Sequence, residues 1–561
     1  MPDNHTSISG SIARLHQVLM LDRKDIVVVY ILAFLAGLVQ LSVPLGIQSI
    51  INFVMAGSLS TSMIVLIALV VFGVFINGLL QIRQLQIIEK LKQKIFVRYS
   101  LEFGDRLPKL NIEKLDKEYL PEMVNRFFET VSLQKGMDKL LIDLPAASIQ
   151  VLLGLTILAF YHPFFIAFGL FLLIIVLAIL RFTSAGGLNT ALLASGYKYG
   201  VAAWLQEVAR TVKSFKYTKG TSLHLNKTDE LVGNYLTART QHFKILLTQF
   251  WSLISFKVII TASMLILGSY LLLNQQINIG QFIAADIIII SIIASIEKVI
   301  INLDSVYEAM VSVEKLGKIT EAEEEKSGSL VLHANNEGVS IQFADVNFSY
   351  NGDKPVINKI NFNVEKGEMI QIAGVSGAGK STVLRLLTGA FTQYNGSVLI
   401  DGIPAANYDL KSLRQLTGIL LGSQDIFYGT LLQNITMDSH KITVSQVTKL
   451  ADIVGLSAFV KDSKDGYDTV LQPVGLKLSG RVRKNILLMR ALLGEHRLLL
   501  LEDPFDHLEE PNKTNTIQYL RESKNVTVLI ASQDQQLSNY CNKVITLSRD
   551  GEILGQQNLL P

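Results

Sequence analysis

Long apolar stretches dominate the chain before residue 305. Most of them approach the ~20 residues that an α-helix needs to cross a ~30 Å hydrocarbon core. Runs such as 287–296 contain almost no polar residue, whereas a buried helix of a soluble protein carries a polar stripe on each turn. The pattern therefore predicts an all-α membrane domain of six helices. They cover roughly residues 26–47, 63–82, 144–161, 163–180, 253–273 and 282–301.

The loops between these helices differ sharply in charge. Segments 49–62 and 274–280 carry no Lys or Arg, whereas 83–139 and 181–244 are rich in both. Positively charged loops stay in the cytoplasm, so we expect the two rich loops and both ends of the six-helix unit there. Both loops keep a helical apolar stripe, which predicts that the membrane helices continue into the cytoplasm.

Several polar side chains interrupt the apolar stretches. A charge at the bilayer centre costs ~3 kcal/mol on insertion scales, so such groups usually face the bundle interior or a hydrated cavity. They indicate a polar pathway, although helix packing alone explains each single residue equally well. Topology argues against a pair between Lys257 and Asp286, because they fall toward opposite leaflets. The polar positions are Gln40, Asn77, Gln81, Gln150, Lys257, Asp286, Glu297 and Lys298.

From residue 340 onward, strand-like and helical runs alternate, as in an α/β domain. The sequence GVSGAGKST at 374–382 follows a strand-like run and precedes a helical one. In such a loop, backbone N–H groups surround phosphates, a lysine adds charge and a serine hydroxyl binds Mg²⁺. We therefore predict a nucleoside-triphosphate site with magnesium. Its predicted residues are Gly374, Ser376, Gly377, Gly379, Lys380, Ser381 and Thr382.

Composition supports a membrane protein with a second, soluble domain. The chain has 561 residues, 49% of them hydrophobic, and a mean hydropathy of +0.36, too apolar for an ordinary soluble protein. Its net charge of +3 gives no support for nucleic acid as a partner. The single cysteine, Cys541, excludes an intramolecular disulfide and a thiolate metal cluster.

These patterns divide the chain into four parts. The apolar run after Lys24 is longer than a signal-peptide core and no A-x-A cleavage pattern closes it, so we expect it in the mature protein. A charged stretch containing EAEEEKSGS reads as a solvated linker. The predicted parts are an N-terminal cytoplasmic segment (1–25), the six-helix domain (26–303), the linker (304–337) and the nucleotide-binding domain (338–561).

A P-loop α/β domain that follows six membrane helices resembles the ATP-binding cassette (ABC) exporters. More narrowly, the chain is similar to half-transporters of the bacterial peptide and toxin secretion type, without their N-terminal peptidase domain. The resemblance covers nearly the whole chain and is most specific at GVSGAGKST. It implies ATP and Mg²⁺ as ligands, a cytoplasmic nucleotide-binding domain, the bacterial inner membrane, and dimerisation with an identical or related half-transporter. A periplasmic adaptor is a further partner that it leaves open.

The resemblance also assigns roles to individual residues. Tyr350 matches the aromatic residue that stacks on adenine, and Glu502 takes the place of a magnesium-binding carboxylate. The sequence LSGRV at 478–482 matches the signature LSGGQ, so Ser479 and Gly480 are expected to contact the nucleotide held by the opposite subunit. Segments 111–127 and 207–216 look like the coupling segments that press on the nucleotide-binding domains.

Several positions depart from the family pattern where hydrolysis is concerned. Asp503 replaces the glutamate that acts as general base, and its side chain is shorter by roughly 1.5 Å. Gly422 replaces a glutamine that senses the γ-phosphate, a role in which Gln424 is a candidate substitute. Ser532 replaces a histidine and carries no charge. Because displacement of ~1 Å in a catalytic site can cost ~10²-fold in rate, we expect slow hydrolysis.

The signature loop departs as well, because Arg481 and Val482 replace Gly-Gln. Two functions remain open. One is an exporter half that moves a peptide, lipid-like or amphipathic substrate with weak hydrolysis. The alternative is a non-hydrolysing ATP-gated scaffold or regulator, or the degenerate half of a heterodimer. A soluble chromosome-handling ATPase with the same cassette is excluded by the six membrane helices.

Overall fold

The computed structural model describes residues 8–57, 61–115, 120–350, 354–559. The chain forms two compact units. Unit 1 comprises Met1–Leu110 and Glu118–Glu323, and unit 2 comprises Asn111–Lys117 and Glu324–Pro561. The short segment Asn111–Lys117, which lies between two long helices of unit 1 in the sequence, thus groups with the C-terminal unit.

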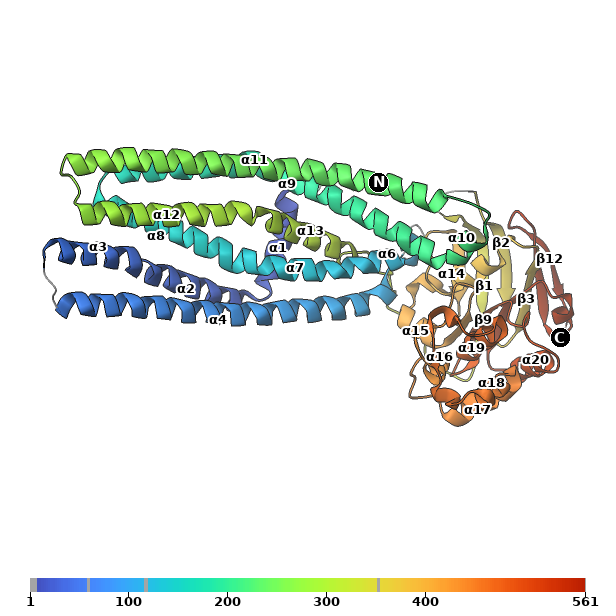
Figure 1. Cartoon of the computed structure of the whole chain (residues 1–561). Helices are drawn as coiled ribbons and strands as arrows, with labels where there is room; N and C mark the ends of the chain where they lie inside the picture. Colours follow the sequence, from blue (N-terminus) through green and yellow to red (C-terminus); the bar gives the residue numbers. More distant parts are fainter. Residues whose placement is uncertain (1–7, 58–60, 116–119, 351–353, 560–561) are drawn as a thin grey trace. The chain divides into compact units, whose positions relative to one another are not determined.

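Unit 1 is a bundle of long helices that run side by side (Figure 1). Helix α2 packs against α4, α8 against α12, and α11 against α9. Six helical segments are long and apolar enough to cross a membrane, which confirms the predicted six-helix domain. The helices are α1 (Ile8–Met20), α2 (Arg23–Gln40), α3 (Ser42–Met55), α4 (Thr61–Arg106), α6 (Leu120–Asn125), α7 (Glu129–Asp138), α8 (Leu144–Tyr161), α9 (Phe164–Arg210), α10 (Val212–Tyr217), α11 (Leu223–Leu273), α12 (Ile279–Ile301) and α13 (Leu303–Thr320).

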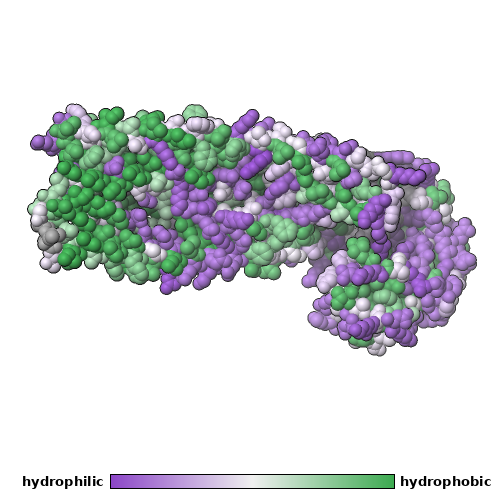
Figure 2. Space-filling view, viewed as in Figure 1, coloured by the Kyte–Doolittle hydropathy of each residue, from purple (hydrophilic) through white to green (hydrophobic). Residues whose placement is uncertain are grey.

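Three of these helices are much longer than a bilayer is thick. Helices α4, α9 and α11 contain 46, 47 and 51 residues. At 1.5 Å per residue each spans about 70 Å or more, against a hydrocarbon core of ~30 Å. Their length confirms that the membrane helices continue beyond the bilayer. Figure 2 shows hydrophobic residues gathered over the end of unit 1 that contains α3 and the start of α4.

Two details of unit 1 differ from the sequence prediction. The first span is two helices, because α2 ends at Gln40 and α3 begins at Ser42. The predicted linker at 304–337 is wrong for its first half, since Leu303–Thr320 forms α13. Val306, Val313 and Leu316 of α13 are buried at helical spacing, and this apolar stripe was masked by the charges around it.

Lys257, Glu297 and Lys298 within the spans are in ion pairs. Lys257 on α11 lies 2.5 Å from the Glu297 carboxylate on α12. Lys298 lies 2.7 Å from Asp143, which precedes α8. Partners of opposite charge lower the cost of placing such groups in a membrane protein. Lys257 thus pairs with Glu297 rather than with Asp286, in line with the topology argument.

Unit 2 is an α/β domain with two larger sheets and a two-stranded antiparallel sheet of β7 and β8. A four-stranded antiparallel sheet has the order β2-β1-β4-β5, and a six-stranded, mainly parallel sheet has the order β12-β11-β3-β10-β9-β6. The strands are β1 (Ile341–Phe348), β2 (Ile357–Val364), β3 (Met369–Gly374), β4 (Asn395–Ile400), β5 (Ile403–Pro404), β6 (Thr417–Leu420), β7 (Gly429–Thr430), β8 (Val470–Leu471), β9 (Leu498–Glu502), β10 (Thr527–Ala531), β11 (Lys543–Leu547) and β12 (Ile553–Asn558).

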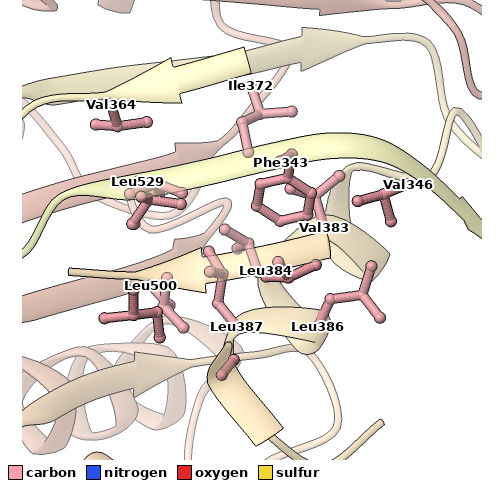
Figure 3. Packing of buried hydrophobic residues seen from close by; sticks show 14 of the residues in the cluster. Phe343, Val346, Val364, Ile372, Val383, Leu384, Leu386, Leu387, Leu500 and Leu529 are labelled. Atoms are coloured by element: carbon pink, nitrogen blue, oxygen red, sulfur yellow. The ribbon is translucent and has the colours of Figure 1, made fainter. Parts of the chain in front are cut away.

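The helices of unit 2 cover the larger sheet, and the continuous apolar runs of its strands follow from burial on both faces. Leu500 of β9 pairs in register with Leu529 of β10, and both are fully buried. Phe343 and Leu384 pack into the same core (Figure 3). The helices are α5 (Ile112–Leu115), α14 (Lys380–Leu387), α15 (Leu410–Gln415), α16 (Leu431–Thr436), α17 (Val444–Val454), α18 (Ser457–Asp462), α19 (Gly480–Leu492) and α20 (Asn512–Glu522).

Candidate functional site

The candidate site lies where β3 ends and α14 begins. Gly374, Gly377 and Gly379 all have positive φ, at 148°, 83° and 87°. A Cβ on Gly374 would lie 2.7 Å from the Leu547 carbonyl, and one on Gly379 would lie 2.8 Å from the Val356 carbonyl. Both contacts are closer than real Cβ atoms show, so glycine is required there. The predicted order of strand, glycine-rich loop and helix is the one observed.

Lys380 curls back over this loop. Its ammonium donates to the carbonyl of Gly374 at 2.8 Å and to that of Val375 at 3.1 Å. The residue is only 8% exposed, so the loop holds its charge in place at the N-terminus of α14. An ammonium and a helix N-terminus that converge on one loop favour a phosphate there.

Ser381 and Glu502, the two predicted magnesium ligands, are in direct contact. The Ser381 hydroxyl donates to one carboxylate oxygen of Glu502, at the end of β9. The N–H of Gly422 donates to the other oxygen at 2.8 Å. A hydroxyl and a carboxylate are hard oxygen donors of the kind that Mg²⁺ prefers. These two side chains therefore fit a magnesium ion that bridges to a phosphate.

Gly422 has room for a side chain. A Cβ there would lie 3.5 Å from the Glu502 carboxylate, an ordinary van der Waals distance. Its φ is not positive, so the backbone does not demand glycine either. Packing around the Cβ position therefore does not explain why glycine stands where the family pattern has glutamine.

Asp503 sits in a strained and partly buried position. Its φ is 42°, a left-handed conformation uncommon for residues other than glycine, and its N–H donates to the Ala531 carbonyl at 2.9 Å. Burial and the nearby Asp506 carboxylate raise the pKa of Asp503 above its ordinary value, while Lys380 lowers it in part. The carboxyl is therefore held close to the phosphate loop but is harder to ionise than an exposed aspartate.

Gln424 and Ser532 are engaged in their own turns. The side-chain carbonyl of Gln424 accepts the N–H of Leu421 at 3.3 Å. Ser532 is 2% exposed, and its hydroxyl oxygen accepts the N–H of Asp534 at 3.2 Å. Both side chains thus form hydrogen bonds within local turns, and their catalytic roles stay predictions.

Tyr350 stands beside the phosphate-loop helix. Its hydroxyl lies 3.1 Å from the Thr382 hydroxyl and accepts from the Arg385 guanidinium at 3.3 Å. Its ring meets Phe348 and Phe391 edge-to-face, with centroids 4.8 Å and 5.7 Å away. The predicted adenine-stacking ring is thereby fixed next to a predicted phosphate-loop residue.

The altered signature loop opens helix α19. The Ser479 hydroxyl caps this helix by accepting the N–H of Val482 at 3.3 Å, and Gly480 is the first helical residue. The Arg481 guanidinium pairs with the carboxylate of Glu509. Both partners are exposed, so the pair contributes little to stability. The pair nevertheless shows the direction of the Arg481 side chain, which stands where the family pattern has glycine.

Glu113 is a contact that sequence reasoning missed. It lies on α5, inside the predicted coupling segment, and its carboxylate accepts the N–H groups of Thr392 at 2.7 Å and Gln393 at 3.2 Å. The preceding residue, Phe391, packs against Tyr350. A carboxylate of the predicted coupling segment is thus two contacts away from the ring of Tyr350, the predicted adenine-stacking residue.

The raised pKa of Asp503 predicts how stability depends on pH. A carboxyl with a raised folded-state pKa contributes stability that is full below the unfolded pKa and is lost as pH rises through the folded pKa. Asp503→Asn removes the titrating carboxyl and therefore this loss of stability at high pH. Asparagine also tolerates a positive φ. We expect the variant to raise the Tm of the purified protein at neutral pH and to raise it less at acidic pH.

Thermal unfolding at both pH values measures this effect. The exposed Asp465→Asn is the matched control and should leave the Tm unchanged at either pH. A larger gain for Asp503→Asn at acidic pH than at neutral pH would contradict the raised pKa.

Comparison with known proteins places this site in a family context. Residues 357–506 match the family model of the ABC transporter. The chain is 30% identical over 283 residues to the alpha-hemolysin translocation ATP-binding protein HlyB of Escherichia coli O157:H7, covering 50% of this chain and 40% of that protein. It is 28% identical over 292 residues to the leukotoxin export ATP-binding protein LtxB of Aggregatibacter actinomycetemcomitans, covering 52% and 41%. The match thus spans about two fifths of the length of these relatives.

A solved structure extends the likeness to nearly the whole chain. The structure of a bacterial Atm1-family ABC exporter with ATP bound superposes with a TM-score of 0.83 over 96% of this chain and 95% of that one. At 18% identity this likeness shows the fold. An ABC domain implies ATP binding, and the residues at the phosphate loop fit that ligand. The chain therefore has the fold of an ABC exporter half, with six long apolar helices followed by an α/β ABC nucleotide-binding domain.

Proposed function

We propose that the chain is one half of an ATP-binding exporter that moves a peptide, lipid-like or amphipathic molecule out of the cytoplasm. The observation that carries the proposal is the phosphate loop with Lys380, Ser381 and Glu502 in place, in a chain that also has six candidate membrane spans. The similarity to toxin translocation proteins supports export as the direction of transport. The proposed location is the bacterial inner membrane, with the nucleotide-binding domain in the cytoplasm.

In this proposal the residues of unit 2 hold Mg-ATP. Tyr350 stacks on the adenine ring, Lys380 and the N–H groups of the loop bind the outer phosphates, and Ser381 and Glu502 hold magnesium. Bound magnesium would neutralise negative charge on the phosphate oxygens. The present contact between Ser381 and Glu502 keeps both ligands within reach of one ion.

Hydrolysis is proposed to be slow. Asp503 is the candidate base, but its carboxyl is short and its raised pKa disfavours the ionised form at a given pH. Gln424 and Ser532 form hydrogen bonds in local turns, which supports the loss of two γ-phosphate contacts. ATP binding then supplies the conformational change, and slow hydrolysis resets it.

The proposed partner is a second half-transporter, either an identical or a related chain. An ABC sandwich places the signature loop of one half over the nucleotide of the other, so Ser479 and Gly480 would act in the partner's site. Arg481 is drawn toward Glu509, which supports an altered contact there. An adaptor toward the periplasm remains a further partner to test.

A second candidate function rests on the same hydrogen bonds that hold the Gln424 and Ser532 side chains in local turns. If no partner restores hydrolysis, ATP occupancy alone would set the conformation of a membrane regulator. The polar groups that the described spans leave without a hydrogen-bond partner, the Asn77 carbonyl and the Ser42 hydroxyl, favour transport, because helix packing alone does not account for them.

ATP binding and turnover by the purified full chain test the proposal. We expect Mg-ATP binding that Lys380→Ala weakens by at least about tenfold, because the loop loses its buried cation. Phosphate release should be about 10²-fold below that of an ABC exporter with the family's residues assayed alongside. Equilibrium nucleotide binding and steady-state phosphate release are the measurements.

Two substitutions separate the alternatives. Asp503→Glu restores the side-chain length of the family's glutamate, and Gly422→Gln adds a side chain where the structure has room for a Cβ. A rise in phosphate release for the double variant supports a degenerate catalytic site. Brisk, Lys380-dependent release by the unaltered chain would overturn slow hydrolysis and indicate a self-sufficient homodimeric exporter.

The contact of Glu113 predicts a coupling effect. ATP that stacks on Tyr350 should stiffen Phe391 and the amides of Thr392 and Gln393, which Glu113 holds. We expect ATP to slow hydrogen exchange at these amides in the unaltered chain, and Glu113→Ala to speed their exchange about tenfold. Glu102→Ala, on α4, is the control. Equal exchange in the Glu113 and Glu102 variants would refute the coupling role.

A further inference from the structure

The first membrane span contains a break with a chemical consequence. Helix α2 ends at Gln40, and α3 begins at Ser42. Pro44 has no N–H, so the Gln40 carbonyl lacks the donor that a continuous helix would provide four residues later. A backbone group freed at membrane depth must be covered by protein or line a hydrated cavity.

A cavity of about 70 Å³ adjoins this break. Gln40 and Pro44 line one side, Gln150 and Gly154 of α8 line another, and Ser291 of α12 completes its polar lining. The Gln150 amide donates to the Ser291 hydroxyl, which leaves the Gln150 carbonyl and the Ser291 proton free for other hydrogen bonds. The remaining lining side chains are aliphatic.

More polar groups lie on the other side of the break, facing α4. The Asn77 amide donates to the side-chain carbonyl of Gln40. Among the described residues, the Asn77 carbonyl and the Ser42 hydroxyl are buried without a hydrogen-bond partner. Buried polar groups left unpaired by protein are costly, and they mark places where water or a ligand completes the bonding.

These groups lie at similar depths in their membrane spans. We count the depth at 1.5 Å per residue from the helix ends that are predicted to lie outside the cytoplasm: Gln150 lies about 16 Å, Ser291 about 18 Å, Gln40 about 22 Å and Asn77 about 24 Å along. The hydrocarbon core is ~30 Å thick, so all four residues lie within about 9 Å of its middle, on the cytoplasmic side. These groups are defined here as the midplane layer: Gln40, Ser42, Asn77, Gln150 and Ser291.

The midplane layer is uncharged. The lining of the cavity includes no acidic or basic residue. Lys257 and Lys298 of the neighbouring spans are paired with Glu297 and Asp143, as described above. A charged ligand group would therefore lie in the cavity without a counter-ion, at a high desolvation cost. Amide and hydroxyl groups match the free acceptors and donors instead.

Interhelical hydrogen bonds alone would explain polar pairs between membrane helices. They do not explain a cavity beside them, or the Gln150 carbonyl and the Ser291 proton that stay free on its lining. We propose that this cavity binds an uncharged hydrogen-bonding group, a hydroxyl or an amide, on the molecule that the chain carries. At about 70 Å³ it admits such a group and a few atoms around it, while the rest of an amphipathic molecule lies outside. The assignment rests on the proposed transport function and names its substrate class.

Cysteine labelling in membranes tests the site directly. Cys541, the native cysteine, is fully buried, and burial raises its pKa to about 12, so the background reactivity is low. Ser291→Cys places a thiol in the cavity. Leu152→Cys is the control, since residue 152 lies about 200° around α8 from Gln150 and is 66% exposed. The probe is methyl methanethiosulfonate, which is small and neutral.

We expect Ser291→Cys to react about tenfold faster than Leu152→Cys, because a hydrated polar cavity supports the thiolate and hydrocarbon does not. N-dodecylacetamide should protect Ser291→Cys, whereas dodecyltrimethylammonium and dodecanoate, with the same chain and charged heads, should not. Adding Gln150→Leu should weaken the amide's protection about tenfold. If Ser291→Cys fails to fold, Ile287→Cys, which also lines the cavity, replaces it.

Several results would overturn the inference. They are labelling of Ser291→Cys no faster than that of Leu152→Cys, equal protection by all three amphiphiles, and protection that Gln150→Leu leaves unchanged. ATP binding by the same preparation separates this outcome from failure of the proposed function. A chain that binds ATP but shows no selective protection disproves only the substrate class, whereas a chain that fails to bind ATP disproves the transporter proposal itself.

Discussion

The carboxylate of Glu502 connects the two structural elements on which the nucleotide site depends. It accepts the Ser381 hydroxyl from the helix after the phosphate loop and the N–H of Gly422 from the segment after β6. Its two oxygens thus join the helix after the phosphate loop and the segment after β6 to the end of β9. The same oxygens would hold magnesium in the proposed function, so Glu502 would serve both as a structural link and as a metal ligand. In that proposal the swapped order of Glu502 and Asp503 keeps a carboxylate at the metal position and affects mainly the base.

In the membrane unit, the corresponding constraint is that polar groups in hydrocarbon need partners. Two ion pairs satisfy it, Lys257 with Glu297 and Lys298 with Asp143. The midplane layer satisfies it only in part, because Pro44 frees a carbonyl and Asn77 keeps an unpaired one. In the proposed transport function the unpaired groups are the ones that can bind a substrate, since a fully satisfied bundle offers a substrate nothing to bind.

The sequence was most informative where a repeated pattern reports burial. Six apolar runs and a glycine-rich loop between a strand and a helix predicted the two-unit fold and the Lys380–Ser381 site. It failed where the outcome depends on local turns or on distant partners. Helix α13 lies in a stretch that the sequence predicts as a linker, because the charged residues around its apolar stripe obscure the stripe. The local hydrogen bonds of Gln424 and Ser532 could not be predicted from the sequence, because a side chain's direction is set by its turn. Glu113 could not be found at all, since its partner Thr392 is 279 residues away along the chain.

We propose above all that the chain binds ATP through its own phosphate loop and a magnesium ion held by Ser381 and Glu502. The decisive measurement is equilibrium binding of ATP to the full chain in lipid nanodiscs, with and without magnesium and with Glu502→Gln alongside. We expect saturable binding that magnesium strengthens in the unaltered chain and strengthens much less in the Glu502→Gln variant. Binding that is absent, or that responds to magnesium equally in both proteins, would contradict it.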